Sequence, residues 1–113
     1  RSSAMPPGIT VIRMEMQMLG YQYYDALRAG DVLFIDSSHV VKPYGDTLTE
    51  LVIILPRLST GVYVHFHDIF LPYDYLPDWA GKNNLYTEQW LLALLLYGAH
   101  AEWKVVWASQ FML

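Results

Sequence analysis

Residues 31–36 read DVLFID, a short apolar run that ends in an aspartate. A run without polar residues at alternate positions is typical of a strand covered on both faces, as in a parallel sheet. The stretch GVYVHFHDIF at residues 61–70 is also mostly apolar and carries two histidines and an aspartate. We therefore expect two parallel strands, each followed at its end by ionisable residues.

The segment between these strands has the pattern of a helix. From Asp46 to Leu58, leucines and a valine recur at spacings of three and four residues, which places them on one helical face. Asp46 or Thr47 is suited to cap its start, and Pro56 lies near its end. A strand, a helix and a strand in this order predict a crossover between neighbouring parallel strands.

The same patterns predict further elements on either side. The alternating and apolar stretches favour two more strands, and helical patterns closed by glycine favour two more helices. These are strands at 9–16 and 102–109, and helices at 23–30 and 87–98. The expected fold is one partial α/β domain over residues 1–113, with a parallel Rossmann-like sheet of about four strands and flanking helices. Residues 1–8 are expected to be disordered or an added tail.

The composition limits the class of protein. Hydrophobic residues make up 54% of the chain and charged residues 16%, so we expect a packed core and a partly apolar surface that meets a partner. The net charge of −4, without a lysine or arginine cluster, argues against nucleic acid and against an anionic membrane. Because cysteine is absent, thiolate metal sites and disulfides are excluded.

Two further sequence features concern location and self-association. The apolar run WLLALLLYGA at 90–99 is too short to span a bilayer, and no signal peptide is visible. A cytoplasmic location is therefore expected. The helix 87–98 has almost no polar face, and such a helix must be buried on all sides. We expect a second copy of the chain to cover it, which makes the protein a homo-oligomer, most simply a dimer.

Ionisable residues follow both predicted strands. Ligands bind at the carboxyl ends of parallel strands, where Asp36 and Asp68 are expected to face one crevice, with His67 and His39 nearby. Two carboxylates with an imidazole are suited to bind Mg²⁺ or Mn²⁺. Equally, one of these residues is suited to act as a general base on a small-molecule substrate.

Each of these residues also has a purely structural interpretation. Asp36 precedes Ser-Ser-His, where an aspartate often closes a turn with its own side chain. A histidine in a strand is usually satisfied by a backbone carbonyl, and His65 is expected to be a core residue. The loop at 71–84, rich in proline, tyrosine and aspartate, is either a substrate lid or an aromatic cluster that closes a small core.

Several stretches together resemble a known family. IDSSH at 35–39, Asp46, ILPRL at 54–58, GVYVHFHDIF at 61–70 and EQW at 88–90 resemble the second half of a class I S-adenosylmethionine-dependent methyltransferase. The resemblance implies a mostly parallel sheet flanked by helices. In metal-dependent O-methyltransferases, acids at the same strand tips hold Mg²⁺, which orients a substrate hydroxyl. The resemblance thus implies metal ligands at Asp36 and Asp68, and catalytic or neighbouring roles for His67 and His39.

The chain departs from this family at the site where the family binds its cofactor. Its seven glycines are scattered and no G-x-G occurs, whereas the family binds its cofactor on a glycine-rich turn. We therefore assign no cofactor-binding residue, expect S-adenosylmethionine to bind only if missing residues complete the site, and expect no methylation by the isolated chain. Two alternatives stay open: a small metal- or ligand-binding module, and a piece of a longer active methyltransferase.

Overall fold

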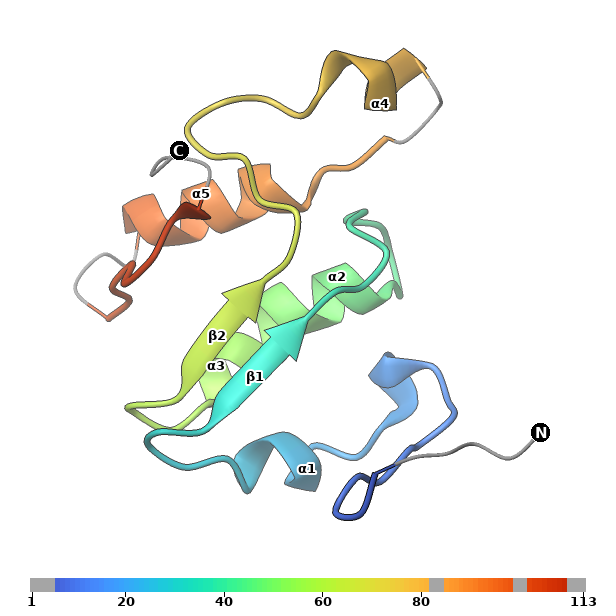
Figure 1. Ribbon diagram of the computed structural model, residues 1–113, viewed down its shortest axis with the longest axis vertical. Helices are drawn as coiled ribbons and strands as arrows, with labels where there is room; N and C mark the ends of the chain where they lie inside the picture. The colour runs from blue at the N-terminus through green and yellow to red at the C-terminus, as the bar shows by residue number, and fades with distance from the viewer. Residues whose placement is uncertain (1–5, 82–84, 99–101, 110–113) are drawn as a thin grey trace.

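The computed structural model describes residues 6–81, 85–98 and 102–109. Strands β1 (Val32–Ile35) and β2 (Tyr63–Phe66) lie side by side and run parallel (Figure 1). This confirms the neighbouring parallel strands expected from the two apolar stretches. The result is a small α/β structure that is compatible with part of a Rossmann-like fold.

A continuous helix connects the two strands, as the leucine spacing predicts. It consists of α2 (Asp46–Leu48), a π-helical segment η2 (Thr49–Ile54) and α3 (Leu55–Arg57). Pro56 has no amide hydrogen to donate one turn back, which favours an irregular hydrogen-bond pattern just before it. Gly45, not Asp46 or Thr47, occupies the N-cap position, and it supplies no side-chain cap.

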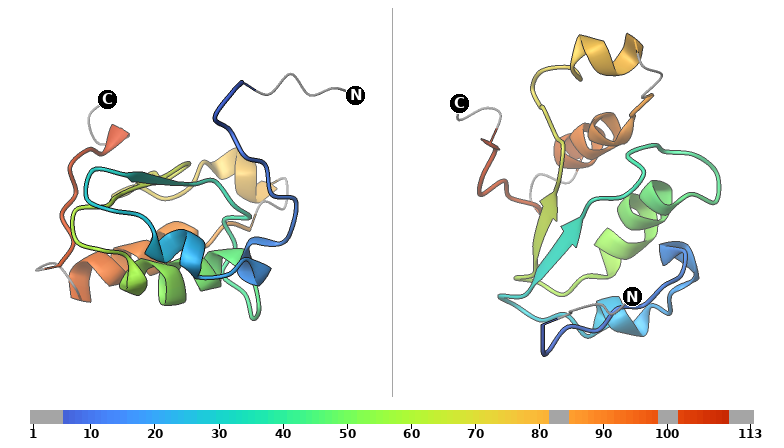
Figure 2. Two further views of the ribbon diagram at one scale, coloured as in Figure 1. Left: turned by 90° about the horizontal axis from the view of Figure 1, so that it is seen from below. Right: turned by 45° about the vertical axis from the view of Figure 1, so that its right-hand side comes forward.

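The helices cover only one face of the sheet (Figure 2). Side chains alternate along a strand, and Ile35 of β1 points inward to the core. The core between the sheet and the helices consists of the buried apolar residues Tyr24, Ile35, Leu51, Ile54 and Leu55. The outer face carries Phe34, which is 53% exposed, so the prediction of a sheet covered on both faces is wrong for the described residues. A continuous apolar run shows that both faces are apolar, but it does not provide the layer that covers them.

The other helices are short, except the last. They are η1 (Met16–Met18), α1 (Gln22–Asp25), α4 (Pro77–Gly81) and α5 (Glu88–Gly98). Helix α5 confirms the helix expected at 87–98, whereas the helix expected at 23–30 ends early. Its last residue, Gly30, adopts a positive φ of 93° in the turn before β1, a conformation that glycine accepts without strain. Within the described ranges, the longest helix is too short to cross a bilayer.

Two predicted strands do not form in the described part of the chain. Residues 9–16 run without strand structure into η1, and residues 103–108 have no regular structure. The expectation of about four strands is therefore wrong, because only β1 and β2 pair there. Alternation and apolar content predict which side chains share a face, but a strand also needs a neighbour for its backbone hydrogen bonds. The expected tail at 1–8 falls largely on residues 1–5, outside the described residues.

We expect the chain to self-associate through the apolar surfaces that remain open. Phe34 projects from the outer sheet face, and on α5 Leu94 is 66% exposed. Burying such side chains stabilises an interface by about 1.5–3 kcal/mol each, and unpaired strand edges favour association further. Light scattering should report a dimer or larger species, and Leu94→Glu or Phe34→Glu should shift it toward the monomer. A monodisperse monomer of the unmodified chain at high micromolar concentration would contradict this expectation.

Candidate metal centre

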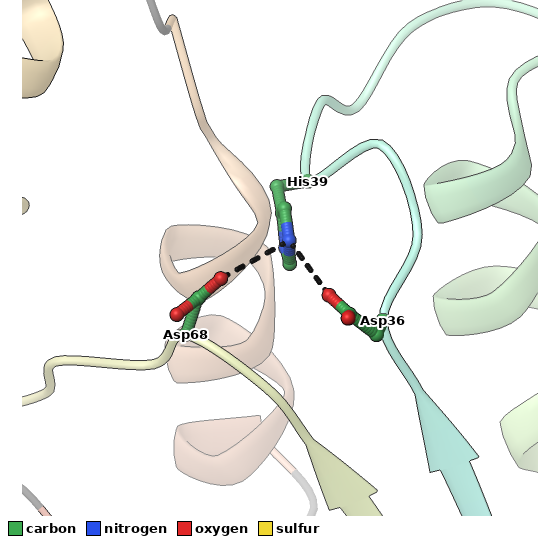
Figure 3. Close-up of side chains that lie close together, drawn as sticks. All are labelled: Asp36, His39 and Asp68. Atoms are coloured by element: carbon green, nitrogen blue, oxygen red, sulfur yellow. Dashed lines mark ion pairs between the residues drawn. The ribbon is translucent and has the colours of Figure 1, made fainter.

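Three side chains converge where the two parallel strands end (Figure 3). Asp36 follows β1 directly, and Asp68 lies just beyond β2. The Nε2 atom of His39 lies 3.2 Å from Oδ1 of Asp36 and 3.5 Å from Oδ2 of Asp68. One ligand atom from each of the three residues lies within 4.8 Å of the others. The structure thus brings both acids together with His39, and it places His67, the second histidine that the sequence singled out, next to the same two acids.

The loop after β1 turns His39 back over the strand tips. His39 and Asp68 both adopt positive φ angles, 64° and 63°, which are uncommon for residues other than glycine. Asp46 holds the loop, because its carboxylate accepts hydrogen bonds from the Ser38 amide at 3.0 Å and from the Ser38 hydroxyl at 2.5 Å. A carboxylate from the following helix therefore organises the turn, and the carboxylate of Asp36 faces His39 instead.

His39 is buried among acids. Its Nδ1 lies 2.7 Å from Oε1 of Glu88, and its ring packs 4.8 Å from the ring centroid of Tyr86. Burial lowers the pKa of His39, but the Glu88 hydrogen bond and the negative charges of Glu88, Asp68 and Asp36 outweigh burial and raise that pKa. The three acids therefore provide a setting that favours positive charge, either on the imidazole or on a cation.

The two histidines at the end of β2, His65 and His67, lie toward solvent. The side chain of His67 is 50% exposed, and its Nδ1 lies 3.1 Å from Oδ2 of Asp68 and 3.6 Å from Oδ1 of Asp36. It stands at the rim of the centre. His65 is exposed on the outer sheet face, where its ring contacts that of Phe34 at 4.8 Å. The expectation that His65 is a core residue is wrong, because the face on which it lies carries no covering layer.

An open cavity adjoins the centre on the β1 side. Its volume is about 760 Å³. Asp36 lines it together with polar residues of the following loop and helix and with apolar residues of the N-terminal segment. The polar lining residues include Ser37, Asp46 and Glu50. Asp36 is therefore shared between the cluster of three side chains and a space that is large enough for a small molecule.

The segment after β2 forms an aromatic cluster. Phe70, Tyr75, Trp79 and Tyr86 contact one another with ring centroids 5.1 to 6.3 Å apart. Tyr86 links this cluster to His39. The described part of the loop predicted at 71–84 therefore contributes to an aromatic cluster, whereas both roles expected of the loop, a substrate lid or the closure of a small core, stay predictions.

The sequence did not single out Glu88 as a site residue, although it carries the closest contact to His39. Glu88 is fully buried, with 0% exposure. It is also the only charged residue in α5, at the start of an otherwise apolar helix. A lone acid there has an ordinary explanation, since acids in the first turn interact favourably with the helix dipole. Its contact with a histidine 49 residues away emerges only from the fold.

Comparison with known proteins supports the resemblance seen in the sequence. A family model described as a methyltransferase domain matches residues 4–69, more than half of the chain. The match includes Asp36, His39, His67 and Asp68 but ends before Glu88. Neither the curated proteins nor the solved structures give a significant match. Because the family model covers more than half of the chain, including the whole segment that builds the two strands and their crossover, the chain belongs to the methyltransferase domain family, as a class I S-adenosylmethionine-dependent type of domain.

Proposed function

We propose that this domain provides the part of an O-methyltransferase active site that binds the metal ion and the methyl acceptor. Asp36 and Asp68 bind Mg²⁺ or Mn²⁺, and a small-molecule hydroxyl is placed beside them. The observation that carries the proposal is the convergence of both carboxylates and the His39 imidazole at the tips of adjacent parallel strands. Ligand sites lie at this edge of open α/β sheets, and family membership supplies the reaction class.

The donor set is suited to a divalent cation. Carboxylate oxygens are preferred ligands of Mg²⁺ and Mn²⁺, and an imidazole nitrogen is accepted by many first-row metals. Adjacent ligands in an octahedral site with bonds of about 2.1 Å lie about 3 Å apart. The separations of 3.2 Å and 3.5 Å between His39 Nε2 and the two carboxylates are close to that spacing. His39 is therefore the third donor in the proposal.

The remaining roles are orientation of the acceptor hydroxyl, removal of its proton and binding of the acceptor molecule. A bound cation would polarise and orient the acceptor hydroxyl. His67 stands at the open rim, and its Nδ1 is within hydrogen-bond distance of Asp68. With Nδ1 donating to Asp68, Nε2 of His67 is left to accept the hydroxyl proton, which is general-base catalysis. The cavity beside Asp36 has room for the acceptor molecule.

Titration with Mn²⁺ tests the proposed metal centre. We expect one ion to bind per chain, with a dissociation constant of about 10⁻⁴ to 10⁻³ M, as in sites with few charged ligands. Calorimetry or the loss of the free-ion paramagnetic signal measures it. Absence of saturable binding in the millimolar range would contradict the metal function.

We expect the isolated chain not to bind S-adenosylmethionine tightly. None of its seven glycines forms a G-x-G, and we propose that the cofactor needs a glycine-rich turn which this sequence does not contain. Calorimetry should show no saturable binding at micromolar cofactor, and the chain alone should not methylate. A dissociation constant near 1 μM, equivalent to about −8 kcal/mol, would contradict this expectation.

A further inference from the structure

Glu88 is buried at a cost in free energy that its surroundings only partly offset. The residue has 0% exposure, and its Oε1 meets Nδ1 of His39 at 2.7 Å. Its second oxygen, Oε2, is buried without a hydrogen-bond partner among the described residues. A buried carboxylate with an unsatisfied oxygen destabilises a fold relative to an apolar residue of similar size. The contact with His39 is therefore difficult to explain by stability alone.

The segment that carries Glu88 also holds the backbone of His39. The carbonyl oxygen of His39 accepts hydrogen bonds from the amides of Thr87 at 2.8 Å and of Glu88 at 3.1 Å. The ring of His39 packs against Tyr86. Three consecutive residues thus fix the backbone, the ring face and one ring nitrogen of the same histidine. This leaves Nε2 as the ring atom that faces Asp36 and Asp68.

We propose that Glu88 is a positioning residue, which accepts a hydrogen bond from Nδ1 of His39 and so directs Nε2 toward Asp36 and Asp68. The inference rests on the proposed metal function, because it adds a supporting residue to that site. In neutral imidazole only one nitrogen carries a proton, and the hydrogen bond made by one nitrogen determines the state of the other. With the proton on Nδ1, the Nε2 lone pair is free to act as a ligand. In metal-binding histidines, the ring nitrogen that does not bind the metal commonly donates a hydrogen bond to such an acid.

The test compares two substitutions at adjacent buried positions. Glu88→Leu removes the hydrogen-bond acceptor behind His39 and introduces an apolar side chain of similar size. Gln89→Leu is the matched control, since Gln89 is equally buried and bonds the backbone of Phe70 and Tyr73, not His39. Glu88→Gln retains an acceptor oxygen and serves as the conservative variant. Nitrogen-15 NMR of the metal-free chain, at a pH where the ring is neutral, reports which nitrogen of His39 carries the proton.

We expect the unmodified chain to carry the His39 proton on Nδ1. Glu88→Leu should move it to Nε2 and weaken Mn²⁺ binding about tenfold or more, as removal of such supporting acids does elsewhere. Glu88→Gln should retain the Nδ1 proton and most of the affinity. Gln89→Leu should lower stability without changing either the ring signals or Mn²⁺ affinity.

Three results would overturn the proposal. They are an Nε2 proton on His39 in the unmodified chain, unchanged ring signals in a folded Glu88→Leu variant, and an equal change in Gln89→Leu. The first needs no variant, so the proposal stays testable even if Glu88→Leu does not fold. If the unmodified chain carries the Nδ1 proton but binds no Mn²⁺, the metal function fails while the positioning role of Glu88 is supported.

Discussion

Replacing both strand-tip acids, as Asp36→Asn with Asp68→Asn, is expected to weaken Mn²⁺ binding at least about 100-fold, which corresponds to about 2.7 kcal/mol. Asparagine keeps the shape of each side chain, but it replaces an anionic ligand by a neutral amide. In the proposed site the two carboxylates supply the negative charge close to the ion, and the third donor, His39, is neutral when it binds. Each single substitution should give a smaller loss that calorimetry with Mn²⁺ measures, whereas the double variant should show no saturable binding in the millimolar range.

The control for each single substitution is Asp78→Asn, which likewise removes one negative charge, from an exposed residue of α4. It should leave Mn²⁺ affinity unchanged, because a solvent-exposed charge at a distance is screened by salt. Thermal unfolding of each variant shows whether the fold persists. Unaltered affinity in the folded double variant, or an equal loss in Asp78→Asn, would place the ion elsewhere.

The sequence predicted the strand-tip acids because their positions depend on local pattern and one topological rule. DVLFID and GVYVHFHD each combine an apolar run with a terminal acid. A single helical crossover makes such strands neighbours in a parallel sheet. The observed pairing, Ile35 opposite Phe66, then brings Asp36 and Asp68 to one edge. This part of the site follows from information contained within a few residues of each acid.

Other features depended on contacts distant in the sequence. His39 lies between the two acids because its loop turns back over the strand ends. Hydrogen bonds to Asp46 and to the first residues of α5 fix the loop in that position. His65 and the strands expected at 9–16 and 102–109 were assigned wrongly for a common reason. Apolar content shows that a segment tends to be buried, but it does not show whether the chain supplies a layer or a paired strand to bury it.

Glu50, which lines the cavity beside Asp36, gives the stability of the fold a dependence on pH. It is only 7% exposed, and its Oε1 accepts a hydrogen bond of 2.7 Å from the Ser37 hydroxyl. Burial raises the pKa of Glu50 to about 7, helped by the charges of Asp46 and Glu88 and opposed by the Ser37 hydrogen bond and by His39. The folded state therefore binds this proton more tightly than the unfolded state does. The stabilising effect of this proton is complete below the ordinary glutamate pKa of 4.5 and is lost as pH rises through about 7.

Glu50→Gln should therefore stabilise the protein at pH 8 and have little effect at pH 4.5. The amide resembles a protonated carboxyl, keeps an oxygen for the Ser37 hydroxyl and never has to ionise in the core. At about 1.4 kcal/mol per pKa unit, the raised pKa corresponds to a gain in the free energy of unfolding of roughly 3 kcal/mol at most. Urea denaturation of both proteins at the two pH values isolates this difference from other titrating groups.

Glu102→Gln removes the same charge from an exposed position and should show no such pH dependence. A Glu50→Gln variant that is destabilised equally at both pH values would mean that Glu50 is already ionised in the folded protein and bound by stronger partners than Ser37.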